Sequence, residues 1–203
     1  MKKTLLFITL SLLVSLSSFA APVLVKMETN RGDIILELNQ DKAPLTVENF
    51  LQYAKDGYYE GTIFHRVISS FMIQGGGFDE DLTRKTPRAN IINEASNGLK
   101  NSKWTIAMAR TNTPDSANSQ FFINVQDNIS LDFTGKHNSQ TWGYAVFGKV
   151  VQGFEVVDEI RFTPTGPNPP FRSDVPIKNM TIKTVKVIDS LPVKTESSTD
   201  SVE

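Results

Sequence analysis

Apolar and polar residues alternate along two short runs after residue 22. Every second residue from Val23 to Met27 is apolar, and Ile34, Leu36 and Leu38 repeat the pattern after a turn at residues 30–32 that contains Asn and Gly. Successive side chains of a strand point to opposite faces, so each run predicts a strand with one buried face. Two such runs joined by a short turn predict a β-hairpin.

The hydrophobic spacing becomes helical in two places. After Pro44, a residue that suits the first turn of a helix, the apolar positions fall three or four residues apart until Gly57, which suits a helix stop. This spacing predicts a helix over residues 44–56. A second, shorter helix is predicted over residues 153–161, with its apolar face formed by Phe154, Val157 and Ile160.

Short strand-like runs separated by turn residues make up most of the rest. They cover residues 62–67, 71–74, 104–109, 120–125, 144–150 and 181–188. Many short strands with two helices and no regular alternation of strand and helix favour an antiparallel barrel or sandwich. Residues 164–176 contain five prolines and predict a loop or an extended connection.

The first twenty residues have the pattern of a secretory signal peptide. Lys2 and Lys3 form a basic start, residues 4–16 are free of charge, and small residues lead to Ala20. The apolar stretch is shorter than the ~20 residues that a spanning helix needs. We therefore expect a signal peptide at 1–20, one domain at 21–192 and a disordered polar tail at 193–203.

Composition narrows the possible functions. The signal holds two of the 21 basic residues and none of the 22 acidic ones, which leaves a mature net charge of −3. This even balance argues against a nucleic-acid or membrane-surface protein. With no cysteine and only two histidines, neither a disulfide framework nor a zinc site is expected.

The most specific signal is a set of short motifs that occur in order along the chain. They are IFHRVI at 63–68, FMIQGG at 71–76, WTIAMA at 104–109, NSQFFI at 118–123 and VFGKV at 146–150. In this order and spacing they resemble the cyclophilins, peptidyl-prolyl cis/trans isomerases, and in particular their bacterial periplasmic branch. The resemblance implies a mainly β fold, a closed eight-stranded antiparallel β-barrel capped by the two helices. It also implies isomerisation of X-Pro bonds in proline-containing polypeptides that are unfolded or partly folded. Because this reaction makes and breaks no bond, no cofactor is expected. The signal peptide predicts a periplasmic protein, and since nothing in the sequence indicates an oligomer, a monomer is expected.

The resemblance also implies roles for individual residues. Arg66 matches the catalytic cationic donor, and the polar side chains of Gln74 and Gln120 match residues that orient this arginine and the substrate backbone. Ala109 and Arg110 match a strand edge that pairs with the peptide. The pocket for the proline ring is matched by Phe71, Met72, Phe122 and Leu131, with Tyr144 where many relatives have a histidine.

Two features depart from the family pattern, and two others are deceptive. Ser130 stands where cyclosporin-sensitive relatives carry tryptophan, and Arg110 replaces the usual asparagine. The Gly-Lys-His at 135–137 resembles a pocket motif of eukaryotic relatives, but its spacing assigns His137 to a loop. The glycines at 75–77 lack the context of a phosphate loop.

His65 is interpreted as a structural or supporting residue.

Rival interpretations belong to other classes of protein. A non-catalytic proline-peptide binding module or holdase chaperone on the same fold would typically lack Arg66. A lipocalin-like barrel would need a ligand cavity inside the barrel. A hydrolase lacks support because the chain has no GxSxG motif and only two histidines.

We predict that export leaves a mature protein that begins at Ala21. The intact mass of periplasmic material should correspond to a chain without residues 1–20, because Ser18 and Ala20 stand at the small-residue positions of the cleavage site. Recovery of the full-length chain from the membrane fraction would instead indicate an anchor.

Overall fold

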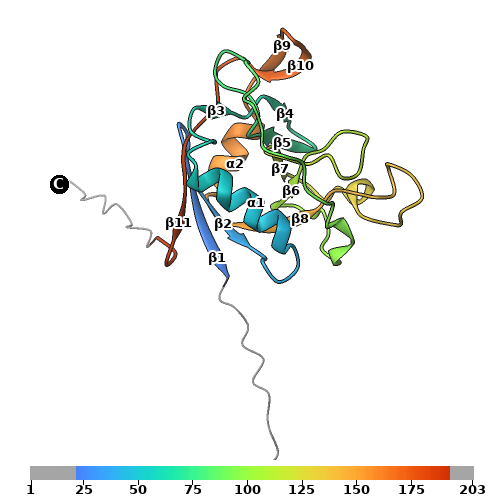
Figure 1. Cartoon of the computed structure of the whole chain (residues 1–203). Helices are drawn as coiled ribbons and strands as arrows, with labels where there is room; N and C mark the ends of the chain where they lie inside the picture. Colours follow the sequence, from blue (N-terminus) through green and yellow to red (C-terminus); the bar gives the residue numbers. More distant parts are fainter. Residues whose placement is uncertain (1–21, 193–203) are drawn as a thin grey trace, which may run out of the picture.

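The structure is a computed structural model that describes residues 22–192. The signal peptide and the tail predicted from the sequence lie outside these residues. A curled β-sheet forms the body of the fold, with a small two-stranded sheet beside it (Figure 1). The strands of the larger sheet are β1 (Val23–Thr29), β2 (Gly32–Leu38), β3 (Thr62–Ile63), β4 (Arg66–Ile68), β5 (Met72–Gly75), β6 (Thr105–Met108), β7 (Phe121–Asn124), β8 (Val146–Gln152) and β11 (Thr181–Ile188).

The predicted hairpin at the start of the chain is confirmed. β1 pairs antiparallel with β2 in a register that puts Met27 opposite Ile34. Both side chains are fully buried, whereas Lys26 on the other face forms an ion pair with Asp33 at 3.1 Å. One face of the hairpin therefore contributes to the core, as the alternation predicts.

The larger sheet has two ends, which corrects the prediction of a closed eight-stranded barrel. Its hydrogen-bonded order is β3-β11-β1-β2-β8-β6-β7-β5-β4, nine strands with β3 and β4 at the ends. The predicted strand over residues 62–67 is divided: Thr62 and Ile63 pair with β11, whereas Arg66 begins the pairing with β5. Phe64 and His65 lie between and belong to neither ladder, so the sheet curls without closing.

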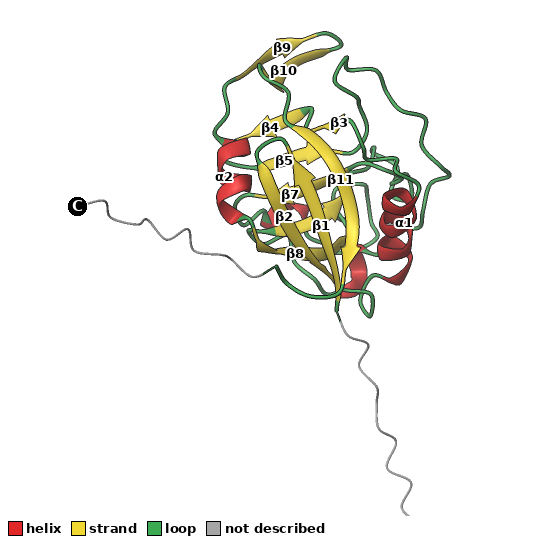
Figure 2. Ribbon diagram, turned by 90° about the vertical axis from the view of Figure 1, so that its left-hand side faces the viewer, coloured by secondary structure: helices red, strands yellow, loops and turns green. Residues whose placement is uncertain are grey.

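The two predicted helices lie on opposite sides of the curled sheet (Figure 2). α1 (Pro44–Lys55) and α2 (Phe154–Arg161) begin and end within one residue of their predicted bounds. No side chain adjacent to α1 caps its first turn. Instead, the carboxylate of Glu94 accepts hydrogen bonds from the backbone N–H groups of Leu45 and Thr46 at 3.2 and 2.8 Å. A remote loop thus satisfies donors that a helix start leaves free.

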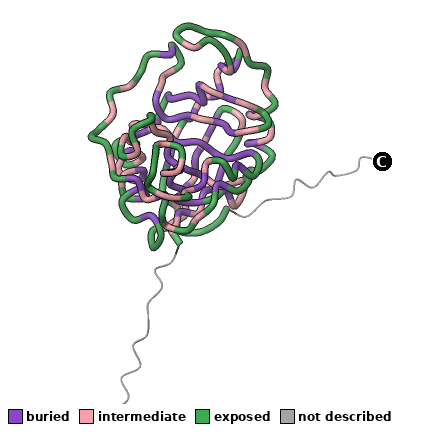
Figure 3. Tube along the Cα trace, turned by 90° about the vertical axis from the view of Figure 1, so that its right-hand side faces the viewer, coloured by how far each residue is buried: buried purple, intermediate pink, exposed green. Residues whose placement is uncertain are grey.

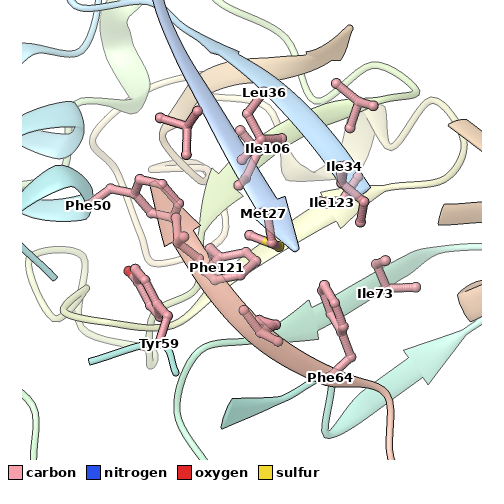
Figure 4. Packing of buried hydrophobic residues seen from close by; sticks show 14 of the residues in the cluster. Met27, Ile34, Leu36, Phe50, Tyr59, Phe64, Ile73, Ile106, Phe121 and Ile123 are labelled. Carbon is pink, nitrogen blue, oxygen red and sulfur yellow. The ribbon is translucent and has the colours of Figure 1, made fainter. Parts of the chain in front are cut away.

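The core fills the inside of the curl. Buried segments form the interior of the trace, and the exposed segments surround them (Figure 3). Phe50 of α1 packs against Phe121, with ring centroids 5.7 Å apart, and against Tyr59 at 5.1 Å. Side chains from the helix and from several strands point toward one another there (Figure 4). This packed interior removes the cavity that a lipocalin-like storage function would need.

The proline-rich segment predicted as a loop or an extended connection contains a second hairpin. β9 (Thr165–Asn168) pairs antiparallel with β10 (Phe171–Pro176), next to β4 (Figure 1). Prolines are tolerated because a two-stranded sheet consists of edge strands only. The hairpin makes apolar contacts through β10, where Val175 and Phe171 pack with Ile63 and Leu82 in a small cluster.

Two shorter elements, the 3-10 turns Ala95–Asn97 and Ile129–Leu131, lie in the connections. Among the described residues, no helix is long and apolar enough to span a membrane.

Candidate active site

Several of the predicted site residues lie on the outer face of β4, β5 and β7. Arg66 stands directly opposite Gln74, and Gln74 stands opposite Phe122 on the next strand. Residues directly opposite one another in antiparallel strands share a face. The intervening Val67 and Ile73 belong to the main core, so the row from Arg66 to Phe122 faces outward.

An apolar cluster lies on this outer face, and we call it the site cluster. Its buried members are Met72, Phe122, Ala107 and Val146. Phe71, Leu131, Tyr144, Ala109, Ile68 and Leu99 are partly buried around them. The four residues predicted to hold a proline ring are thus brought together from three separate parts of the chain.

Tyr144 completes one side of the site cluster. Its ring meets that of Phe122 edge-on, with centroids 5.6 Å apart and an interplanar angle of 78°. The guanidinium of Arg110 lies over the ring of Tyr144, 4.4 Å from the ring centroid. Arg110 also donates hydrogen bonds to the carbonyl oxygens of Gly143 at 2.8 Å and Ser139 at 2.7 Å. These contacts fix the loop that leads to Tyr144.

The two predicted glutamines bond to each other. Nε2 of Gln74 donates to Oε1 of Gln120 at 2.9 Å. With Ala109, Arg110 and Arg84 they line a pocket of about 170 Å³ next to the site cluster. Gln74 faces Arg66 across the strands, but no hydrogen bond joins their side chains within the described residues 22–192.

The glycines at 75–77 serve packing. A Cβ atom on Gly77 would lie 2.5 Å from Cγ of Gln120, and one on Gly76, whose φ is +79°, would lie 2.8 Å from the ring of Phe121. Side chains at these two positions would displace the core ring and the site glutamine. Close packing accounts for both glycines without a phosphate ligand.

The backbone next to β6 offers a short edge. The N–H of Ala109 donates to the carbonyl of Gln120 at 2.9 Å. Within residues 22–192, the carbonyl of Ala109 and the backbone N–H and carbonyl of Arg110 make no hydrogen bond. These are the groups that remain for pairing with a bound peptide.

Arg66 has one charged neighbour in the described part of the chain. Its side chain is 43% exposed, and its Nε lies 3.8 Å from Oδ2 of Asp174 on β10. The sequence does not point to Asp174, because the proline-rich segment around it predicts a loop or an extended connection. No local motif signals the contact, since it depends on how a distant hairpin docks.

His65 points away from the site. It is 2% exposed, and its ring packs against Phe78 and Phe171 with centroids 4.6 and 5.4 Å away. Its Nδ1 is buried without a hydrogen-bond partner. Burial lowers the pKa of His65 from 6.5 to about 4; the backbone of Ile63 opposes this shift, and the charge of Arg66 adds to it. This environment favours a structural role over proton transfer.

His137, Trp142 and Ser130 lie outside the site cluster. His137 is exposed in the loop before Tyr144. Trp142, in the same loop, lies under the ammonium group of Lys136, 4.8 Å from its centroid, and is not part of the cluster. Ser130 is exposed beside Leu131. No group of three metal-binding side chains occurs among residues 22–192.

The fold and the site together define a β-sheet protein that presents an arginine and an apolar patch on its outer face. Over residues 24–187 the sequence matches the family described as cyclophilin type peptidyl-prolyl cis-trans isomerase/CLD. The chain therefore belongs to the cyclophilin-type peptidyl-prolyl cis-trans isomerases, a family of enzymes, and the resemblance inferred from the motifs is confirmed.

Individual relatives agree with this assignment. The chain is 54% identical over 164 residues to peptidyl-prolyl cis-trans isomerase cyp18 of Streptomyces antibioticus, covering 81% of this chain and 98% of that protein. It is 51% identical to peptidyl-prolyl cis-trans isomerase B of Escherichia coli, covering 81% and 99%. A crystal structure of a Cryptosporidium parvum cyclophilin in the presence of the dipeptide Ala-Pro matches with a TM-score of 0.70 and 29% identity, covering 82% of this chain and 99% of that one.

The buried His65 predicts a pH dependence of stability. Between pH 6.5 and about 4, His65 is protonated in the unfolded state but not in the folded state. The contribution of His65 to the free energy of unfolding is therefore fully present above pH 6.5 and is lost as the pH falls. The expected loss is about 1.4 kcal/mol per pH unit within this window.

Urea unfolding at pH 7 and pH 5 measures this loss, with His65→Phe as the matched variant that keeps an aromatic ring. The free energy of unfolding of the wild type should fall by roughly 2 kcal/mol more than that of the variant. Equal losses in both proteins would show that His65 does not resist protonation.

Proposed function

We propose that this chain catalyses cis/trans rotation of X-Pro peptide bonds and thereby assists the folding of exported proteins. The observation that carries the proposal is the position of Arg66 on the same outer face as the site cluster. A cation beside an apolar patch suits a prolyl peptide, whose ring is apolar and whose reacting atom is an amide nitrogen.

The reaction itself sets the requirements. Rotation about the X-Pro bond faces a barrier of ~18–20 kcal/mol because the amide has partial double-bond character. Uncatalysed exchange takes tens to hundreds of seconds, and no bond is made or broken. The enzyme must therefore bind the twisted amide more tightly than either planar form.

Arg66 meets the electrostatic requirement. When the amide twists, the proline nitrogen regains a lone pair and can accept a hydrogen bond. A guanidinium is permanently charged and presents its N–H groups in a rigid plane, so it stabilises this nitrogen without a proton transfer. The partial exposure of the arginine leaves it accessible to a peptide in solution.

The apolar residues meet the binding requirement. Phe71, Met72, Phe122 and Leu131 hold the proline ring while the preceding residue rotates. The free backbone groups of Ala109 and Arg110, with Gln74, Gln120 and Tyr144, hold the flanking peptide. The Cryptosporidium parvum cyclophilin, whose crystal structure was determined in the presence of Ala-Pro, supports a prolyl ligand for this fold.

We further propose that the protein works in the periplasm as a monomer. The basic and apolar pattern of residues 1–20 supports export. Its clients would be proline-containing polypeptides that are unfolded or partly folded. A protease-coupled isomerisation assay on the purified mature chain separates this enzyme from the non-catalytic binding module or holdase: only the enzyme accelerates the slow phase.

Arg66→Ala should lower kcat/KM for a prolyl peptide by about 10²–10³-fold, by analogy with the loss of one oxyanion-hole donor. The arginine is half-exposed and outside the main core, so the circular dichroism spectrum should not change. His137→Ala is the control and should retain activity, because His137 is exposed outside the site cluster. A variant Arg66→Ala that keeps most of its kcat/KM while remaining folded would contradict the mechanism.

Cyclosporin should inhibit this protein only weakly, because Ser130 lacks the apolar face and indole N–H of the tryptophan in sensitive relatives. Half of a tryptophan's ~150–250 Å² at ~25 cal/mol per Å² is worth roughly 2–3 kcal/mol, and the lost hydrogen bond adds about 1 kcal/mol. Affinity should therefore be about 10²–10³-fold lower.

Titration of the wild type and of Ser130→Trp with cyclosporin tests this difference. The variant should bind markedly more tightly, while turnover of a prolyl peptide should change little. Near-stoichiometric inhibition of the wild type, or no gain in the variant, would overturn the role given to Ser130.

A further inference from the structure

The second hairpin brings a carboxylate to the arginine of the site, and we propose that Asp174 is a positioning residue for isomerisation. In this proposal, which rests on the proposed function, Asp174 orients the guanidinium of Arg66 toward the substrate amide. The Nε of Arg66 and Oδ2 of Asp174 are 3.8 Å apart.

The hairpin packs against the residues that precede Arg66 and against the loop after β5. Phe171 and Val175, on either side of Asp174, pack with Ile63 and Leu82. The ring of Phe171 also contacts His65 at 5.4 Å and Phe78 at 5.0 Å between centroids. Asp174 is therefore held by neighbours on both sides, next to β4.

The backbone of β10 is shaped so that it departs from regular pairing at Asp174. Phe171 pairs with Asn168, and Val175 pairs with Gly166. Between these two pairs the chain advances by four residues in β10 but by only two in β9, which defines a bulge. Such a bulge changes the direction in which side chains point, and bulges are common next to active sites. Asp174 itself has a φ of +67°, a conformation that aspartate tolerates better than most residues.

The contact leaves the reactive end of Arg66 free. It is made through Nε, and the terminal nitrogens of this arginine have no hydrogen bond or ion pair to any other of the described residues 22–192. Gln74, directly across from Arg66, makes no side-chain hydrogen bond with it in residues 22–192, and its amide nitrogen donates to Gln120. Asp174 thus restrains the guanidinium from one side and leaves its outer N–H groups for the substrate.

The size of the effect follows from the exposure of the pair. The side chains of Arg66 and Asp174 are 43% and 33% exposed, so solvent screens their attraction. Partly exposed ion pairs change an equilibrium by about two- to five-fold. We expect the same factor in kcat, since an arginine that samples other rotamers meets the twisted amide less often.

The decisive variant is Asp174→Asn in the mature chain. Asparagine has nearly the same size and also tolerates the backbone conformation, so the hairpin should keep its structure. We expect kcat for a prolyl peptide to fall about two- to five-fold with little change in KM. Asp189→Asn, at an exposed aspartate that takes part in no ion pair with the described residues, is the matched control and should behave as the wild type.

Two further measurements distinguish positioning from a structural role. The ¹⁵Nε–H order parameter of Arg66 should decrease in Asp174→Asn, while the thermal midpoint should not. In an Arg66→Ala background, assayed at high enzyme concentration, Asp174→Asn should have no additional effect on the rate. A structural role would lower the rate in both backgrounds.

The outcomes separate this inference from the proposed function. A wild-type chain without isomerase activity would refute the proposed function itself. An active wild type with an Asp174→Asn variant of equal or higher kcat would overturn only the role of Asp174. An unchanged order parameter for Arg66 in that variant would also overturn it.

Discussion

The site depends on one constraint, the alternation of side chains across the sheet. Val67, Ile73 and Ile123 of β4, β5 and β7 are buried in the main core. Their chain neighbours must therefore face outward, which is where Arg66 and Phe122 lie. A slip of one residue would turn the arginine into the apolar core, and burying an unpaired charge is very costly. The core thus selects the register that presents the site.

The interruption between β3 and β4 lets three consecutive residues serve three different parts of the molecule. Phe64 joins the main core, with its ring 6.1 Å from that of Phe121. His65 joins the aromatic contacts of the second hairpin, and Arg66 faces the site cluster. A continuous strand would place the first and third of these residues on the same face. The break that keeps the sheet from closing is therefore also what separates the core from the site.

Much of the fold and of the candidate site could be predicted from local patterns. Helix bounds followed from spacing, because α1 and α2 each bury one face; the motif residues Phe71, Met72 and Phe122 did gather in one cluster. What could not be predicted depends on contacts between distant segments. The prolines around Phe171 predicted a loop where the structure has a hairpin. No local sequence pattern predicts the contact of Asp174 with Arg66, or that of Glu94 with the start of α1.

The surroundings of Arg66 suit a reaction that depends on orientation rather than on proton transfer. The neighbouring residue His65 has a side chain whose ordinary pKa lies close to neutral pH. Burial next to the ring of Phe78 lowers this pKa to about 4, so His65 is uncharged at neutral pH. Because its guanidinium is permanently charged, the arginine contributes a fixed charge and the direction of its N–H groups. That direction is set in part by Asp174, more than a hundred residues later in the chain. The charge therefore comes from a local sequence motif, whereas its orientation depends on a contact that only the folded chain makes.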